Sequence, residues 1–166
     1  LYGCGISQTK EMQILTKLIF TSKVNFPNTV IDADGLNILA KLNKEGISWW
    51  KNMPSSTILT PHLKEMSRLT GIQAKSIQKS RVSICVEFAK IWNKIIVLKG
   101  PNTIIAFPNK KAMISSFTNP LLATAGTGDI LAGLIAGLIA QKVPPEIAAT
   151  LGVYIHSESA LLTSYN

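Results

Sequence analysis

The sequence has few cysteines and few acidic residues, and each shortage narrows the class of protein. Only two cysteines, Cys4 and Cys85, occur among 166 residues, and their separation matches no metal-binding or redox motif. This excludes a disulfide scaffold and favours reduced thiols in a cytoplasmic protein. The 9 acidic residues are outnumbered by 17 lysines and arginines, which leaves a net charge of +8.

Long apolar segments are missing as well. The longest run, ILAGLIAGLIA at residues 130–140, is much shorter than the roughly 20 residues that a membrane span requires. The start, LYGCGISQTKEM, has neither the basic region nor the apolar region of a signal peptide. We therefore expect no membrane association. Since the chain begins without Met on a glycine-rich turn, we expect residues 1–166 to be a partial domain whose N-terminal part is missing.

The positive charge is scattered along the chain. No dense basic block or interleaving of basic and aromatic residues, as in nucleic-acid-binding proteins, occurs in the sequence. We therefore expect no nucleic-acid partner. A basic surface does suit the electrostatic steering of a small phosphorylated ligand.

The apolar content of 46% predicts a packed globular domain. Apolar residues at helical spacing or in short β-branched runs alternate along the chain. The expected helices cover residues 10–22, 35–43, 76–92, 128–141 and 144–164, with another beginning near Pro61; the expected strands cover 29–34, 56–60 and 94–100, and a hairpin pairs 102–108 with 111–117. This alternation predicts a mainly parallel sheet covered by helices on both faces.

Polar and small residues follow the expected strands. DADGLN, TPHLKE and LKGPNT each come at a strand end, and TAGTGD opens the helix at 128–141. Ligands of such sheets bind at the carboxyl ends of the strands, so these segments are expected to form the site.

In TAGTGD, small residues let a ligand approach the backbone, and the helix start attracts an anion. Asp129 has two interpretations that remain open here. Its carboxylate could cap the helix, or it could act as a general base on a substrate hydroxyl beside a phosphate.

The other polar residues have ordinary explanations too. Asp32 and Asp34 alternate along a strand and should face opposite ways, so turn residues are favoured over ligands of a water-bridged magnesium ion. His62 and Glu65 share a helix face and could bind a ligand, although a cap or a surface position would also explain them.

Lys99 could contact a nucleotide phosphate, but lysines are common in loops. His156 is expected to be a packing or surface residue.

Four segments together resemble one family: DADGLNIL, LTPHLKEMSRL, VLKGPNTIIA and NPLLATAGTGDILAGLIAGLIAQ. Across roughly residues 28–158 they are similar to the ADP- or ATP-dependent NAD(P)H-hydrate dehydratases, in particular the bacterial type. The resemblance implies a ribokinase-like, three-layer α/β/α fold with a mainly parallel central sheet. It also implies repair of hydrated nicotinamide cofactors, in which ADP or ATP with Mg²⁺ drives loss of water from the S epimer of NADHX or NADPHX.

The same resemblance assigns roles to residues and names no metal ligand. Asp129 matches the substrate-contacting acid and base, and His62 and Gly5 match further substrate contacts. The adenine nucleotide is assigned to two strips, formed by Lys99, Gly100, Pro101, Asn102 and Thr103, and by Gly126, Thr127 and Gly128. The family also implies a homo-oligomer and an NAD(P)H-hydrate epimerase, either fused or separate.

Two segments depart from the family pattern. GPGLG reads GCGIS, which puts Ser7 at the last glycine, where a side chain is expected to crowd the turn or the substrate. HPGE reads HLKE, with Leu63 and Lys64 at the helix start.

Two alternative functions remain: a ribokinase-like kinase for a vitamin precursor, such as hydroxyethylthiazole or hydroxymethylpyrimidine, and a degenerate fold that binds nucleotide without turnover.

Overall fold

The computed structural model describes residues 1–22 and 25–163, and its centre is a mixed sheet of five strands. In sheet order the strands are β1 (Val30–Ile31), β2 (Ile58–Leu59), β3 (Ile95–Leu98), β4 (Ile104–Ala106) and β5 (Met113–Ile114). The first three strands run parallel, whereas β4 is antiparallel to both β3 and β5. The expected parallel arrangement therefore covers β1 to β3, and the expected hairpin supplies the antiparallel edge.

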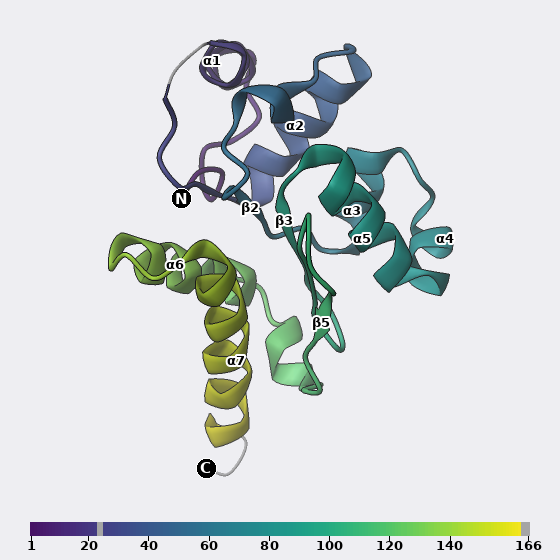
Figure 1. Ribbon diagram of the computed structural model, residues 1–166, viewed down its shortest axis with the longest axis vertical. Coiled ribbons are helices and arrows are strands. Elements are labelled where there is room, and N and C mark those ends of the chain that lie inside the picture. The colour runs from purple at the N-terminus through teal and green to yellow at the C-terminus, as the bar shows by residue number, and fades with distance from the viewer. Residues whose placement is uncertain (23–24, 164–166) are drawn as a thin grey trace.

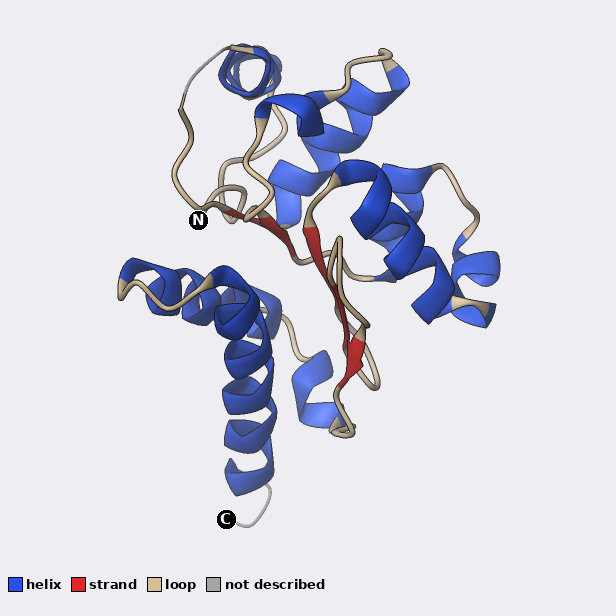
Figure 2. Cartoon of the chain, in the orientation of Figure 1, coloured by secondary structure: helices blue, strands red, loops and turns tan. Residues whose placement is uncertain are grey.

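Helices connect and cover these strands (Figures 1 and 2). The α-helices are α1 (Lys10–Thr21), α2 (Ala33–Lys44), α3 (Leu63–Thr70), α4 (Ala74–Lys79), α5 (Arg81–Trp92), α6 (Thr127–Ala140) and α7 (Pro145–Thr163). Two short 3₁₀ helices, η1 (Trp49–Asn52) and η2 (Pro120–Ala123), complete the described elements. Neither 3₁₀ helix was expected from the sequence.

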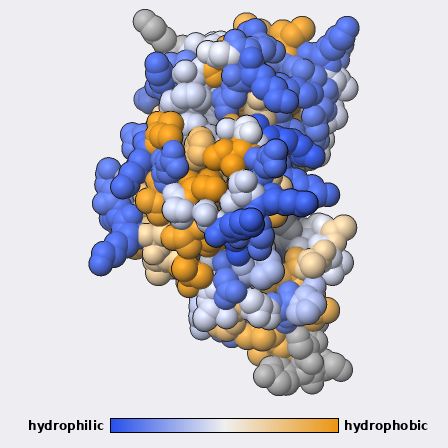
Figure 3. All heavy atoms as spheres, turned by 90° about the vertical axis from the view of Figure 1, so that its right-hand side faces the viewer, coloured by the Kyte–Doolittle hydropathy of each residue, from blue (hydrophilic) through white to orange (hydrophobic). Residues whose placement is uncertain are grey.

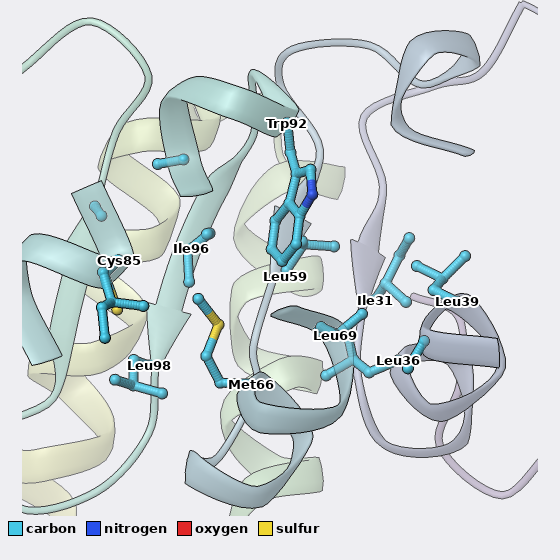
Figure 4. Packing of buried hydrophobic residues seen from close by; sticks show 14 of the residues in the cluster. Ile31, Leu36, Leu39, Leu59, Met66, Leu69, Cys85, Trp92, Ile96 and Leu98 are labelled. Atoms are coloured by element: carbon cyan, nitrogen blue, oxygen red, sulfur yellow. The ribbon is translucent and has the colours of Figure 1, made fainter. Parts of the chain in front are cut away.

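Buried residues of the sheet pack on both faces because successive strand side chains point to opposite sides. Ile31, Leu59 and Ile96 belong to a cluster shared with α2, α3 and α5 (Figure 4). Val30 and Ile58 belong to a second cluster with residues of α6 and α7. Figure 1 shows these two helix layers on opposite sides of the sheet. The expected three-layer α/β/α architecture is confirmed.

Two expected element boundaries were wrong. The strand expected over 29–34 ends at Ile31, and α2 begins at Ala33, so Asp34 lies in the first turn of a helix. A carboxylate is favourable there because it faces the positive end of the helix dipole. The helix expected over 76–92 is divided into α4 and α5 at Ser80, whose φ of −137° and ψ of 41° are not helical. No glycine or proline marks that break in the sequence.

One face of the molecule carries both hydrophilic and apolar side chains at its surface (Figure 3). Figure 3 shows the face that carries α4 and α5, where apolar side chains gather near the middle among hydrophilic ones. Val82 and Ile91 of α5 are exposed apolar residues. Within residues 1–22 and 25–163, no helix combines the length and the apolar character needed to cross a bilayer.

Candidate functional site

The carboxyl ends of the parallel strands meet at one edge of the sheet. Asp32 follows β1, the Pro61–His62 pair follows β2, and Lys99 follows β3. The backbone N–H of Lys99 donates to the carbonyl of Pro61 at 2.8 Å, which ties the last two ends together. Lys99 is therefore held at the centre of the edge where ligands of such sheets bind.

The side chain of Lys99 reaches across this edge to Asp32. Its Nζ donates to Oδ1 of Asp32 at 2.6 Å, where the aspartate side chain is 1% exposed and the lysine 17% exposed. Oδ2 of the same carboxylate is buried and has no hydrogen-bond partner among the described residues. Asp32 is therefore more than the ordinary turn residue favoured from the sequence. Asp32 and Asp34 do not alternate along one strand, because Asp34 lies in α2. Asp34 instead accepts a hydrogen bond from the side chain of Gln8.

Lys99 also lies against the first turn of α6. A Cβ atom added at Gly128 would lie 3.2 Å from the lysine Nζ, which is tighter than an ordinary contact. The turn before it is left-handed at Gly126, which has a φ of +89° and occupies the N-cap position. Because the first N–H groups of a helix have no intrahelical partners, the ammonium of Lys99 and the start of α6 together form a cradle for an anion.

A cavity of about 330 Å³ opens beside this cradle. Its lining includes six of the residues expected to hold the nucleotide: Lys99, Gly100, Pro101, Thr103, Thr127 and Gly128. Two others, Asn102 and Gly126, lie outside the described lining. Asn102 instead directs its amide to the carbonyl of Ser115, across the hairpin. The two strips that are distant in sequence thus lie on one cavity.

The other wall of the cavity was not expected from the sequence. It is formed mainly by the segment from Phe117 to Ala123 and by Val153, His156 and Ser157 of α7. The imidazole of His156 is near the backbone of Thr127; burial and the charge of Lys99 lower its pKa, while a hydrogen bond to Thr127 opposes this. The expectation of a mere packing or surface histidine missed this position, because nothing near His156 in the sequence indicates a cavity.

His62 and Glu65 form the cap of α3. The Nδ1 atom of His62 accepts the backbone N–H groups of Lys64 and Glu65, and the carboxylate of Glu65 accepts the N–H of His62 at 2.8 Å. This reciprocal arrangement is a capping box with histidine in the usual place of serine or threonine. Burial, Lys99 and Arg68 lower the pKa of His62, so its imidazole is favoured in the neutral form that accepts these bonds. HLKE therefore starts a helix without proline or glycine.

Asp129 is an exposed residue in the first turn of α6, and its carboxylate does not occupy the N-cap position. The sulfur of Cys4 lies beside this carboxylate, within 4.8 Å of one of its oxygen atoms. Burial and the nearby carboxylates of Asp129 and Asp32 raise the pKa of Cys4 to about 12. Cys4 is thus a protonated thiol beside two carboxylates, which its position in the sequence did not indicate.

The N-terminal loop brings Cys4 to this place by pairing with β1. The N–H of Tyr2 donates to Val30, and the carbonyl of Tyr2 accepts from the N–H of Asp32. Gly5 and Ser7 follow in left-handed conformations, with φ of +73° and +65°, and both are exposed. The backbone conformation of Ser7 is therefore unfavourable for a residue with a side chain, and the crowding of the substrate stays a prediction.

Comparisons with known proteins agree with this geometry. A family model described as NAD(P)H-hydrate dehydratase matches residues 1–166. The chain is 40% identical over 154 residues to the bifunctional NAD(P)H-hydrate repair enzyme of Moorella thermoacetica, covering 93% of this chain and 28% of that protein. It is 32% identical to the ADP/ATP-dependent NAD(P)H-hydrate dehydratase of Bacillus subtilis, whose crystals were grown with ATP and Mg²⁺ and soaked with CoA. That structure superposes with a TM-score of 0.80 over 99% of this chain and 57% of that one.

A ribokinase-like superfamily protein of Enterococcus faecalis superposes with a TM-score of 0.73 at 27% identity, over 94% of this chain and 52% of that one. The fold is therefore ribokinase-like. The chain spans between about a quarter and somewhat more than half of the length of these proteins. The match over all 166 residues and the superposition agree that the chain belongs to the NAD(P)H-hydrate dehydratase family.

Proposed function

We propose that the protein containing this chain dehydrates the S epimer of NADHX or NADPHX to the intact cofactor, driven by ADP or ATP with Mg²⁺. The observation that carries the proposal is the position of Lys99. One ammonium group joins the buried Asp32 carboxylate to the start of α6, at the mouth of a cavity. An anion-binding cradle on a cavity is what a nucleotide-dependent reaction requires.

The residues around the cavity fit an adenine nucleotide. A volume of about 330 Å³ is within the range of small-molecule sites, which begins near 300 Å³. Residues 99–103 and 126–128 would hold the nucleotide, with its phosphates at the ammonium of Lys99 and the N–H groups at the start of α6. Mg²⁺ prefers oxygen ligands, and the phosphate oxygens of the nucleotide meet that preference.

Asp129 would act on the substrate as a general base. It accepts the proton of the hydroxyl group of the hydrate, because its carboxylate is exposed at the edge of the cradle. Lys99 stabilises negative charge as the hydroxyl becomes a phosphate ester, and the nucleotide supplies the phosphoryl group that makes this oxygen a leaving group. Gly5 and His62, which lie at the same edge of the sheet as Asp129, would make further contacts with the substrate.

The cellular setting follows from the same proposal. The two cysteines are free thiols, which supports a cytoplasmic location. The product of an epimerase that interconverts the two hydrate epimers would be the natural substrate. We also expect the whole protein to form a homo-oligomer.

The test uses the full-length protein with purified S-NADHX, Mg²⁺ and either ADP or ATP. The return of the absorbance of the reduced nicotinamide measures dehydration. We expect a nucleotide-dependent signal that Asp129→Asn reduces by about 10²-fold or more while the protein stays folded. Asp34→Asn is the matched control, because Asp34 is also an acid in the first turn of a helix at this edge but accepts from Gln8.

Full activity of Asp129→Asn would contradict the role of this carboxylate. Absence of dehydration together with phosphorylation of hydroxyethylthiazole or hydroxymethylpyrimidine would instead identify a small-molecule kinase. Nucleotide binding without turnover of any of these substrates would identify a degenerate enzyme.

A further inference from the structure

Three potential metal ligands from distant parts of the chain meet beside the cradle. One atom each from Cys4, Asp32 and Asp129 lie within 4.8 Å of one another. Cys4 comes from the N-terminal loop, Asp32 from the end of β1 and Asp129 from the first turn of α6. Among the described residues, this is the one group of three such side chains close enough to share an ion.

A second observation is that one buried carboxylate oxygen of this cluster has no hydrogen-bond partner among the described residues. Asp32 is 1% exposed, and its Oδ1 is satisfied by Lys99 at 2.6 Å. Its Oδ2 is buried with no hydrogen-bond partner among residues 1–22 and 25–163. A buried carboxylate oxygen without a partner is costly, since burial removes its hydration without replacement. An ion or a ligand at the cluster would supply the missing contact.

The charges define which ion fits. Once the thiol is deprotonated, the cluster carries three negative charges from Cys4, Asp32 and Asp129. Lys99 on Oδ1 of Asp32 contributes one positive charge. The remaining charge of −2 is balanced by a divalent cation, and the sulfur ligand favours Zn²⁺ over Mg²⁺, which prefers oxygen.

We propose that Cys4, Asp32 and Asp129 form a three-ligand site for Zn²⁺, with a fourth position open to water or to a bound molecule. A zinc–sulfur bond forms as the Cys4 thiol loses its proton to solvent, and no oxidant or reductant takes part. Lys99 stays on the outer oxygen of Asp32 and orients the carboxylate toward the ion.

Occupation of this site has a consequence for activity that rests on the proposed function. Asp129 cannot accept a proton from the substrate while its carboxylate is bound to zinc. Zn²⁺ is therefore an inhibitor that acts at Asp129, and a chelator restores the activity. Mg²⁺ in excess does not displace it, because the sulfur ligand is a poor partner for magnesium.

The test uses the full-length protein and Co²⁺ as a spectroscopic substitute for Zn²⁺. We expect a sulfur-to-cobalt charge-transfer band in the near ultraviolet, which one equivalent of Zn²⁺ abolishes. Cys4→Ser should remove the band and weaken Zn²⁺ binding by more than about tenfold, measured by competition with a chromophoric chelator. Cys85→Ala is the matched control and should leave both unchanged, because Cys85 is buried in the core on the other side of the sheet.

Asp129→Asn provides a second variant at an exposed position, and it should also weaken Zn²⁺ binding. Far-ultraviolet circular dichroism verifies that each variant is folded. The site is overturned if the band is absent in the wild type, if it survives in Cys4→Ser, or if Cys85→Ala removes it. Because cobalt spectra need no substrate, a missing band with intact dehydration refutes the zinc site alone, and a band without dehydration refutes only the proposed function.

Discussion

The ammonium of Lys99 lies 2.6 Å from Oδ1 of Asp32, although the two residues are 67 positions apart in the chain. This ion pair joins the ends of β1 and β3, and Gly128 at the start of α6 packs against the same nitrogen. A charge pair of this kind strongly couples its two members, because either one alone would be a poorly solvated charge.

We expect that coupling to be measurable in a double-mutant cycle. Lys99→Met should reduce the free energy of unfolding by roughly 3 kcal/mol, because it leaves the buried carboxylate of Asp32 unpaired. Asp32→Asn combined with Lys99→Met should recover part of this loss, with a coupling energy above about 1 kcal/mol. Urea denaturation of the four proteins measures the cycle.

The control is the pair of Lys17 and Glu45, which is similarly close at 2.8 Å but has side chains that are 49% and 51% exposed. Its coupling energy should lie below about 1 kcal/mol because water screens both charges. Equal coupling in the two cycles would show that burial of the Lys99–Asp32 pair has no energetic effect.

Two glycines in α6 should respond in opposite ways to a methyl group. Gly128→Ala places a Cβ 3.2 Å from Nζ of Lys99, so it should displace the ammonium and weaken nucleotide binding by about tenfold. Gly133→Ala meets nothing within 4 Å, so it should stabilise the helix by about 0.5–1 kcal/mol and leave nucleotide binding unchanged. Calorimetric titration with ADP and thermal unfolding measure the two effects, and equal ADP affinities would refute the contact.

Two residues of the N-terminal loop, Gly5 and Ser7, have the same left-handed backbone conformation but differ in having a side chain. Ser7 has a left-handed backbone with φ of +65°, so Ser7→Gly should stabilise the protein by about 1 kcal/mol. Gly5→Ala should destabilise the protein by a similar amount, because φ is +73° there and this conformation is unfavourable for alanine. A steric clash does not contribute, since no atom lies within 4 Å of the added methyl group. Thermal unfolding of both variants measures the difference. A Ser7→Gly protein that is less stable than the wild type would mean that the serine side chain has a stabilising contact.

Lys94 should make stability depend on pH. Its side chain is 1% exposed, its Nζ donates to the carbonyls of Trp92 and Asn93, and burial lowers its pKa to about 8 from 10.5. Between these two values the unfolded chain binds more protons at this group than the folded chain. The contribution of Lys94 to the free energy of unfolding should therefore rise with pH from about 8 to 10.5, by up to about 1.4 kcal/mol per unit.

The measurement compares wild type with Lys94→Met by chemical denaturation at pH 7.5 and pH 10. The stability of the wild type relative to the variant should increase at the higher pH. Lys90→Met is measured in parallel as the control for the loss of one lysine, because Lys90 is an exposed lysine of α5. A constant difference for Lys94→Met would show that its ammonium keeps its ordinary pKa.

The order of helices and strands could be predicted from the sequence alone because it depends on local patterns. Short β-branched runs predicted β1, β2 and β3, and the small residues before Asp129 predicted the start of α6 within one residue. The edge of the sheet where DADGLN and LKGPNT meet was also predictable, since parallel strands direct their carboxyl ends to one edge.

Contacts between distant segments could not be read from those patterns. The sequence does not show that Asp32 is buried against Lys99, that His156 lines the cavity, or that Cys4 lies beside Asp129. Each contact depends on how loops and helices pack after the sheet has formed, and no residue near it in the chain signals its partner. The sequence by itself thus determined the order of the main helices and strands and the candidate segments, whereas the tertiary structure decided which charges are buried and paired, because pairing requires proximity in space.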